Sequence, residues 1–132
     1  MANALAEDIG SGDATTNAII NANHRSAAVI TTREEIVLCG VPLVKEVFNQ
    51  LDPECEIQIL NEDGHQVDEG SNILSIMATT RALLAGERTA LNFIQRLSGI
   101  ATLASLYAEE VKSSKSLILD TRKTAPGWRQ LE

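Results

Sequence analysis

Aromatic side chains and cysteines are scarce in this sequence, and each shortage excludes a class of protein. Phenylalanine, tryptophan and tyrosine make up 3% of the 132 residues, so the core must be built from aliphatic side chains. So few aromatic rings also argue against a surface that stacks single-stranded nucleic-acid bases. Cys39 and Cys55 are too few and too far apart for a metal knuckle or a redox pair. We expect both to be small buried thiols in a reducing compartment.

Basic residues are also in short supply, because 11 lysines and arginines stand against 18 acidic residues, a net charge of −7. This sign repels a phosphate backbone, so we expect no nucleic-acid partner. No apolar run approaches the roughly 20 residues of a membrane span, and MANALAEDIG lacks the features of a secretory signal. We therefore expect a cytoplasmic protein without a membrane partner, whose few cations must be concentrated wherever it binds an anion.

The hydrophobic pattern predicts a small antiparallel sheet combined with helices. Residues 1–25 are polar and rich in turn formers, which predicts a loop with acidic caps. The β-branched and alternating stretches predict strands over 26–32, 34–39 and 55–60 and a strand that ends near Met77. Helical spacing of apolar residues predicts helices over 41–52 and from Thr79 or Thr80 to Ser114.

The long helix should carry one apolar stripe and one isolated cation. Its stripe consists of Leu84, Leu91, Ile94 and Leu97 and continues through Leu103 and Leu106. Ser98-Gly99 interrupts the pattern and predicts a kink or two successive helices. Arg88 lies on or beside the stripe, and no acidic residue stands three or four positions away. This arginine either reaches solvent or binds an anion from outside its own helix.

The chain closes with LILDTRKTAPGWRQLE, in which an aliphatic stretch leads directly into two adjacent cations. Leu117–Asp120 has no polar alternation, which is typical of a strand buried on both faces of a parallel sheet. Functional groups gather at the carboxyl ends of such strands. Thr121, Arg122 and Lys123 offer a hydroxyl, a guanidinium fork and an ammonium there, a set that suits a dianionic or phosphorylated ligand. A solvated basic turn is the alternative.

A glycine rhythm in DGHQVDEGSNILSI, formed by Gly64, Val67, Gly70 and either Ile73 or Leu74, is similar to that of lipoyl and biotinyl carrier domains. Those domains present a modified lysine in a hairpin, and this stretch has no lysine. The rhythm therefore indicates a β-hairpin rather than a swinging-arm carrier.

Three stretches together resemble one enzyme family. DTRKTAPGWR, ERTALNFIQRLSGIATL and EDIGSGDATT look like the quinolinate phosphoribosyltransferases, the carboxylating nicotinate-nucleotide pyrophosphorylases, over nearly the whole chain from about Leu5 onward. The resemblance implies transfer of phosphoribose from phosphoribosyl pyrophosphate to quinolinate, with Mg²⁺ and loss of carbon dioxide, in NAD synthesis. It also implies a homodimer in which Arg88 of one subunit reaches the other's site, where Thr121, Arg122 and Lys123 bind substrate.

The resemblance further implies an α+β fold, a hammerhead-like N-terminal α/β sandwich over residues 1–113. Residues 114–132 would then begin an α/β barrel, and the rest of that barrel does not follow Glu132. We expect the chain to be inactive alone for this reason. Two alternatives remain open: a stand-alone dimerisation or carrier-like module, and a related phosphoribosyltransferase for another acidic heterocycle.

Overall fold

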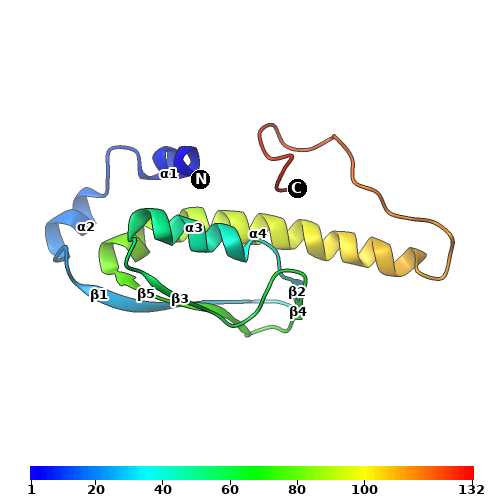
Figure 1. Ribbon diagram of the computed structural model, residues 1–132, viewed down its shortest axis with the longest axis horizontal. Helices are drawn as coiled ribbons and strands as arrows, with labels where there is room; N and C mark the ends of the chain where they lie inside the picture. Colours follow the sequence, from blue (N-terminus) through cyan, green and yellow to red (C-terminus); the bar gives the residue numbers. More distant parts are fainter.

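The computed structural model describes every residue from Met1 to Glu132, and it shows one long helix laid across a small antiparallel sheet (Figure 1). In chain order the elements are α1 (Ala2–Ile9), α2 (Ala14–Ile19), β1 (Arg25–Thr31), β2 (Ile36–Val37), α3 (Val41–Leu51), β3 (Glu56–Ile59), β4 (Gln66–Val67), β5 (Asn72–Thr79) and α4 (Thr80–Val111). The predicted α+β class is confirmed. None of the helices is long and apolar enough to cross a membrane.

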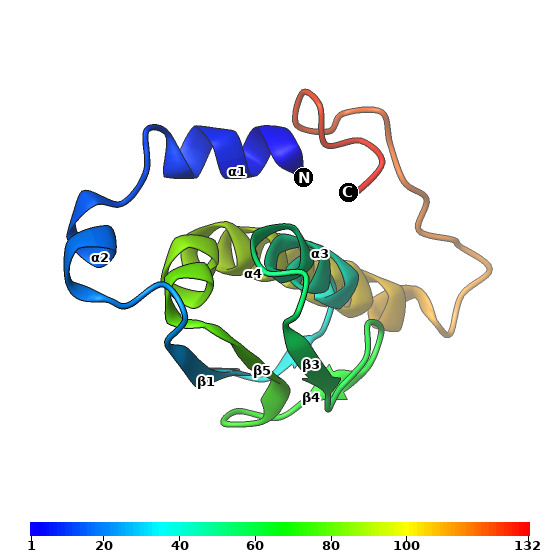
Figure 2. The same cartoon turned by 60° about the vertical axis from the view of Figure 1, so that its left-hand side comes forward.

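The sheet places β5 between β1 and β3, with antiparallel pairing on both sides. A separate ribbon joins β2 to β4. The helices α3 and α4 cover one face of the sheet, and α1 lies on the far side of these two helices (Figure 2). The core therefore lies between β5 and the helices, and its fully buried side chains include Leu38, Val44, Val47, Leu74 and Ile76.

The N-terminal region differs from the predicted loop, because it forms the two short helices α1 and α2. The acidic cap was correctly predicted at one position. Asp13 precedes α2, and its carboxylate accepts hydrogen bonds from the backbone N–H of Thr16, at 2.9 Å, and from the Thr16 hydroxyl. The hydroxyl bond contributes most, and the backbone bond next, to a pKa of Asp13 below its ordinary value. Helices this short hold their shape by capping and by packing.

The helix α4 runs unbroken for 32 residues, so the kink predicted at Ser98-Gly99 is absent. Ser98 is buried and its hydroxyl bonds the backbone of Cys39, which joins α4 to the segment before α3. The predicted stripe is only partly correct. Ile94 and Leu97 are buried, whereas Leu84, Leu103 and Leu106 are exposed.

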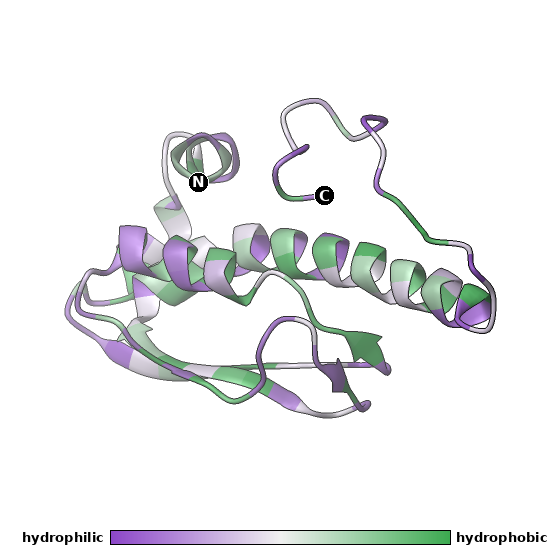
Figure 3. Cartoon of the chain, turned by 45° about the vertical axis from the view of Figure 1, so that its right-hand side comes forward, coloured by the Kyte–Doolittle hydropathy of each residue, from purple (hydrophilic) through white to green (hydrophobic).

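The strand predicted over Leu117–Asp120 does not form, and this prediction was wrong. Residues 112–132 contain no regular helix or strand, and Leu117 and Leu119 are 81% and 76% exposed. Figure 3 shows the hydrophobic stretch in the coil that follows α4. A strand needs a neighbour that accepts its backbone hydrogen bonds, and no other strand lies beside this segment.

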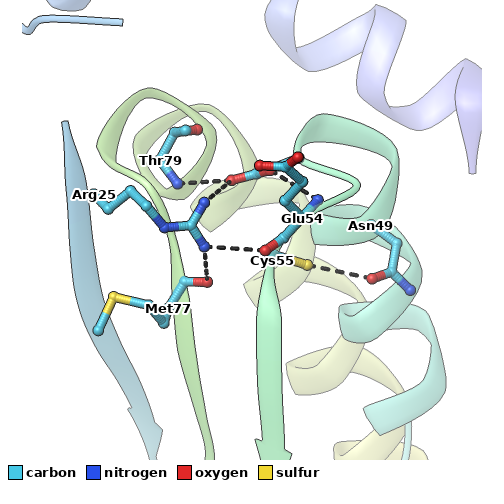
Figure 4. A network of polar contacts seen from close by, with 7 residues as sticks. Arg25, Asn49, Glu54, Cys55, Met77 and Thr79 are labelled. Atoms are coloured by element: carbon cyan, nitrogen blue, oxygen red, sulfur yellow. Dashed lines mark hydrogen bonds and ion pairs between the residues drawn. The ribbon is translucent and has the colours of Figure 1, made fainter. Parts of the chain in front are cut away.

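A buried carboxylate ties the end of α3 to the start of α4. Asp52 accepts hydrogen bonds from the backbone N–H groups of Thr79, at 2.8 Å, and Glu54, at 3.0 Å. It also forms an ion pair with Arg25 at 3.5 Å. Arg25 also donates to the carbonyls of Glu54 and Met77, which Figure 4 shows together. The Thr79 bond contributes most to a pKa of Asp52 below its ordinary value, and burial opposes it.

Replacing Asp52 with asparagine is expected to lower the free energy of unfolding at pH 7 by about 1–3 kcal/mol, because an amide N–H₂ would meet a backbone N–H donor. The folded pKa of Asp52 lies below the unfolded value, so this stabilisation is present above that value, near 3.8. It is lost as the pH falls through the lower, folded value. Urea unfolding at several pH values should show the difference between the proteins shrinking below about pH 4.

Asp68→Asn is the matched control for this charge change. Asp68 is exposed, and its hydrogen bonds all run through its backbone carbonyl. Its variant should unfold within about 0.5 kcal/mol of the parent at every pH. Equal unfolding of the Asp52 and Asp68 variants would show that the network adds no stability.

Candidate substrate site

Arg88 lies in the first half of α4, beside a cleft that α1 and α4 form together. The cleft has a volume of about 490 Å³. The Arg88 Nη1 atom lies 2.9 Å from the Asp8 Oδ1 atom of α1, and the two groups form an ion pair. The predicted absence of an acidic partner in its own helix is thus correct, and the anion that Arg88 binds within this chain is the Asp8 carboxylate of α1. This partner is 80 positions away in sequence, and helical spacing identifies only partners three or four positions away.

The cleft is too acidic to hold a dianion by itself. Asp8, Asp13 and Glu87 line it together with Arg88, which gives three carboxylates to one guanidinium. Arg88 is 74% exposed, so its pairing with Asp8 is a surface ion pair of about 0–1 kcal/mol. Arg88 can therefore leave Asp8 at little cost when another anion is offered outside this acidic cleft.

Thr121, Arg122 and Lys123 lie side by side on the exposed segment that follows α4. The Thr121 hydroxyl accepts a hydrogen bond of 3.0 Å from the backbone N–H of Lys123 and so shapes a tight local turn. The side chains of Arg122 and Lys123 form no hydrogen bond or ion pair. Two adjacent cations without a counter-ion repel each other, and an anion that binds both removes this repulsion.

Arg88 and the segment 121–123 form no polar pair within this chain. Arg88 bonds only Asp8 of α1, and no hydrogen bond or ion pair links it to Thr121, Arg122 or Lys123. The chain thus presents its predicted substrate-binding cations as two separate groups. One belongs to the helical layer and the other to the C-terminal segment.

A second arginine of α4, Arg96, has a defined place that the sequence did not reveal. Its Nε atom donates to the Glu132 Oε1 atom at 2.7 Å, and its Nη2 atom donates to the same oxygen. The Arg96 Cζ atom lies 5.4 Å from the ring centroid of Trp128, which stacks on Phe93 at 5.0 Å. The hydrogen bond from the Ala125 N–H, and then that from Arg96, lowers the pKa of Glu132.

The residues of this chain form no cation site of their own. No three histidine, cysteine, aspartate or glutamate side chains lie close enough together to hold a metal ion. The Mg²⁺ expected from the resemblance therefore finds no fitting set of ligands here. Cys39 and Cys55 are free thiols, but both are half-buried rather than buried as predicted, and partial burial raises the pKa of each.

Comparison with known proteins gives one consistent result. The sequence profile of the family described as "Quinolinate phosphoribosyl transferase, N-terminal domain" matches residues 13–98. The chain is 38% identical over 130 residues to a chloroplastic carboxylating nicotinate-nucleotide pyrophosphorylase of Arabidopsis thaliana, which covers 98% of this chain and 37% of that protein.

Two solved structures share the fold. NadC from Streptococcus pyogenes matches with a TM-score of 0.94 and 36% identity, over 98% of this chain and 46% of the other. Nicotinate-nucleotide pyrophosphorylase from Ehrlichia chaffeensis matches with a TM-score of 0.92 and 43% identity, over 98% and 47%. The chain thus spans less than half of each relative's length, and the similarity extends into the segment that follows α4.

Proposed function

Because the chain belongs to the quinolinate phosphoribosyltransferase family, we propose that it forms the N-terminal domain of an enzyme that joins quinolinate to phosphoribosyl pyrophosphate. The reaction releases pyrophosphate and carbon dioxide and gives nicotinate mononucleotide for NAD synthesis. The observation that carries this proposal is the pair of exposed cations, Arg122 and Lys123, which have no counter-ion in the chain.

The chemistry assigned to these residues is electrostatic. Quinolinate carries two carboxylates, and the guanidinium of Arg122 can hold one of them through two parallel hydrogen bonds. The ammonium of Lys123 adds a point charge beside it. Positive charge around the ring stabilises the negative charge that remains on it when carbon dioxide leaves. Thr121 supports this arrangement by bonding the backbone N–H of Lys123.

Arg88 takes part from a second copy of the chain in a homodimer. Its guanidinium is exposed, its own cleft is too acidic for a dianion, and it forms no hydrogen bond or ion pair with residues 121–123 of the same chain. A symmetric dimer would bring the Arg88 of each subunit to the cations of the other. Such sharing would complete the charge around the two carboxylates of the substrate.

Mg²⁺ enters the reaction as the complex of phosphoribosyl pyrophosphate, and so as part of a substrate. Mg²⁺ dehydrates reluctantly, and it is commonly bound through substrate phosphates with only one or two protein carboxylates.

The proposal is tested with the purified full-length gene product, quinolinate, phosphoribosyl pyrophosphate and Mg²⁺. We expect nicotinate mononucleotide and carbon dioxide in equal amounts, and removal of Mg²⁺ by chelation should lower turnover at least about tenfold. Nicotinate in place of quinolinate separates a related phosphoribosyltransferase from the one proposed. A full-length product that binds and converts none of these compounds would contradict the proposal and favour a stand-alone dimerisation module.

A further inference from the structure

The C-terminal segment is attached to α4 at one place, through two pairs of side chains. Trp128 stacks on Phe93, which is buried in the helix face, with an angle of 29° between the rings. The second pair is Arg96 and Glu132: the Arg96 guanidinium bonds the Glu132 carboxylate. The same guanidinium also lies over the Trp128 ring. A guanidinium held by a carboxylate and an aromatic face has little freedom left for another ligand.

Glu132 extends this attachment back toward the substrate cations. Its Oε2 atom accepts a hydrogen bond of 3.0 Å from the backbone N–H of Ala125. The Ala125 carbonyl in turn accepts the N–H of Trp128 at 3.0 Å. Residues 125–132 thus form a closed turn fixed to α4, and this turn begins two positions after Lys123.

We propose that Arg96 and Glu132 form a latch that positions the backbone of Thr121, Arg122 and Lys123 for the anionic substrate. This inference rests on the proposed function of these three residues. Arg96 is a positioning residue that acts through Glu132, because its Nε and Nη2 atoms both donate to the Glu132 carboxylate. The latch gives Arg96 a role different from that of Arg88.

The latch bears on the cost of ordering the backbone that carries the substrate cations. Ordering a backbone residue costs about 1–2 kcal/mol, and a substrate that had to order Thr121, Arg122 and Lys123 would lose that amount from its binding free energy. The bonds of Glu132 to Arg96 and to Ala125 hold the adjacent turn against α4, so part of this cost is met when the chain folds.

The first test measures amide hydrogen exchange in the full-length gene product, in a peptide that covers residues 120–131. Arg96→Met keeps the aliphatic stem and removes the hydrogen bonds, so exchange in this peptide should become faster. Arg96→Lys keeps the charge without the guanidinium fork, so its exchange rate should lie between those of Arg96→Met and the parent. Arg33→Met is the matched control, because Arg33 is exposed and outside all four ion pairs.

The second test follows quinolinate saturation in the same proteins. Arg96→Met should raise KM for quinolinate about tenfold while kcat changes less, since misplaced cations weaken binding before chemistry. Equal exchange in the Arg96 and Arg33 variants would overturn the latch, and so would faster exchange with an unchanged KM. A parent protein whose peptide 120–131 exchanges more slowly than that of Arg96→Met, but which does not turn over quinolinate, would instead contradict the proposed function. Failure of the latch and failure of the proposed function are therefore distinguishable.

Discussion

Replacing Arg122 with alanine in the full-length gene product is expected to lower kcat/KM for quinolinate by about 10²–10⁴-fold. Arg122 is exposed and free of any side-chain partner, so the variant loses only what the guanidinium does for a ligand. Two charge-assisted hydrogen bonds to a carboxylate contribute about 1.5–3 kcal/mol each, and every 1.4 kcal/mol is a factor of ten. Steady-state rates of nicotinate mononucleotide formation measure the loss.

The controls for this variant separate charge from geometry. Arg122→Lys keeps the charge and loses the fork, and we expect it to recover part of the activity. Arg33→Ala removes an exposed cation elsewhere and should leave kcat/KM unchanged. If the Arg122 variant turned over quinolinate as fast as the parent, Arg122 could not be the residue that holds the substrate.

Mixing two inactive variants tests whether Arg88 and Arg122 act in one site from different chains. Random exchange of subunits between Arg88→Ala and Arg122→Ala dimers makes half of the dimers mixed, and each mixed dimer has one intact site. About a quarter of the parent activity should therefore return. A single-chain site would recover nothing, because every chain would still lack one of the two arginines.

The sequence predicted those elements whose pattern is local. The β-branched run of β1, the alternation of β3 and the apolar spacing of α3 each arise from residues that face one core. Thr121, Arg122 and Lys123 could be proposed as a substrate site from sequence alone, because their chemistry is contiguous in sequence. Asp13 was recognisable as a cap because its partner, Thr16, is three positions away.

The sequence did not reveal features that depend on distant partners. Arg88 pairs with Asp8 and Arg96 pairs with Glu132, over 80 and 36 positions, and no periodicity records such pairs. The α1 and α2 helices are short and carry many polar and turn-forming residues. Their sequence therefore shows only a weak helical pattern, and a loop was predicted instead. Leu117–Asp120 has the composition of a buried strand, but strand formation also needs a neighbouring strand, which composition cannot supply.

Gly86 marks the tightest contact between the two helices that cover the sheet. A Cβ atom placed on Gly86 would lie 2.8 Å from Phe48 Cε1, 2.9 Å from Leu51 Cδ1 and 3.0 Å from Val47 Cγ1. Val47 and Phe48 are buried, with exposed fractions of 0% and 3%, so neither side chain can turn aside into solvent. The separation of α3 from α4 is therefore set by the absence of a side chain at this position.

Gly86→Leu is expected to lower the free energy of unfolding by about 3 kcal/mol, because four carbon atoms must enter a filled space between α3 and α4. This loss occurs although leucine favours a helix over glycine by about 1 kcal/mol. Gly99→Leu is the matched control in the same helix, since a Cβ atom there meets nothing within 4 Å. Its variant should be as stable as the parent or more stable by up to about 1 kcal/mol.

Urea unfolding of the two variants, followed by far-ultraviolet circular dichroism, measures both effects in one experiment. Opposite shifts of the midpoint would show that helix packing decides the result at Gly86 and that helix propensity decides it at Gly99. The Gly86 variant should also weaken substrate binding, because moving α4 away from α3 displaces Arg88 from the rest of the fold. Equal midpoints for the two variants would mean that α3 can move away from α4 without cost, and the close packing at Gly86 would then not be a constraint on the fold.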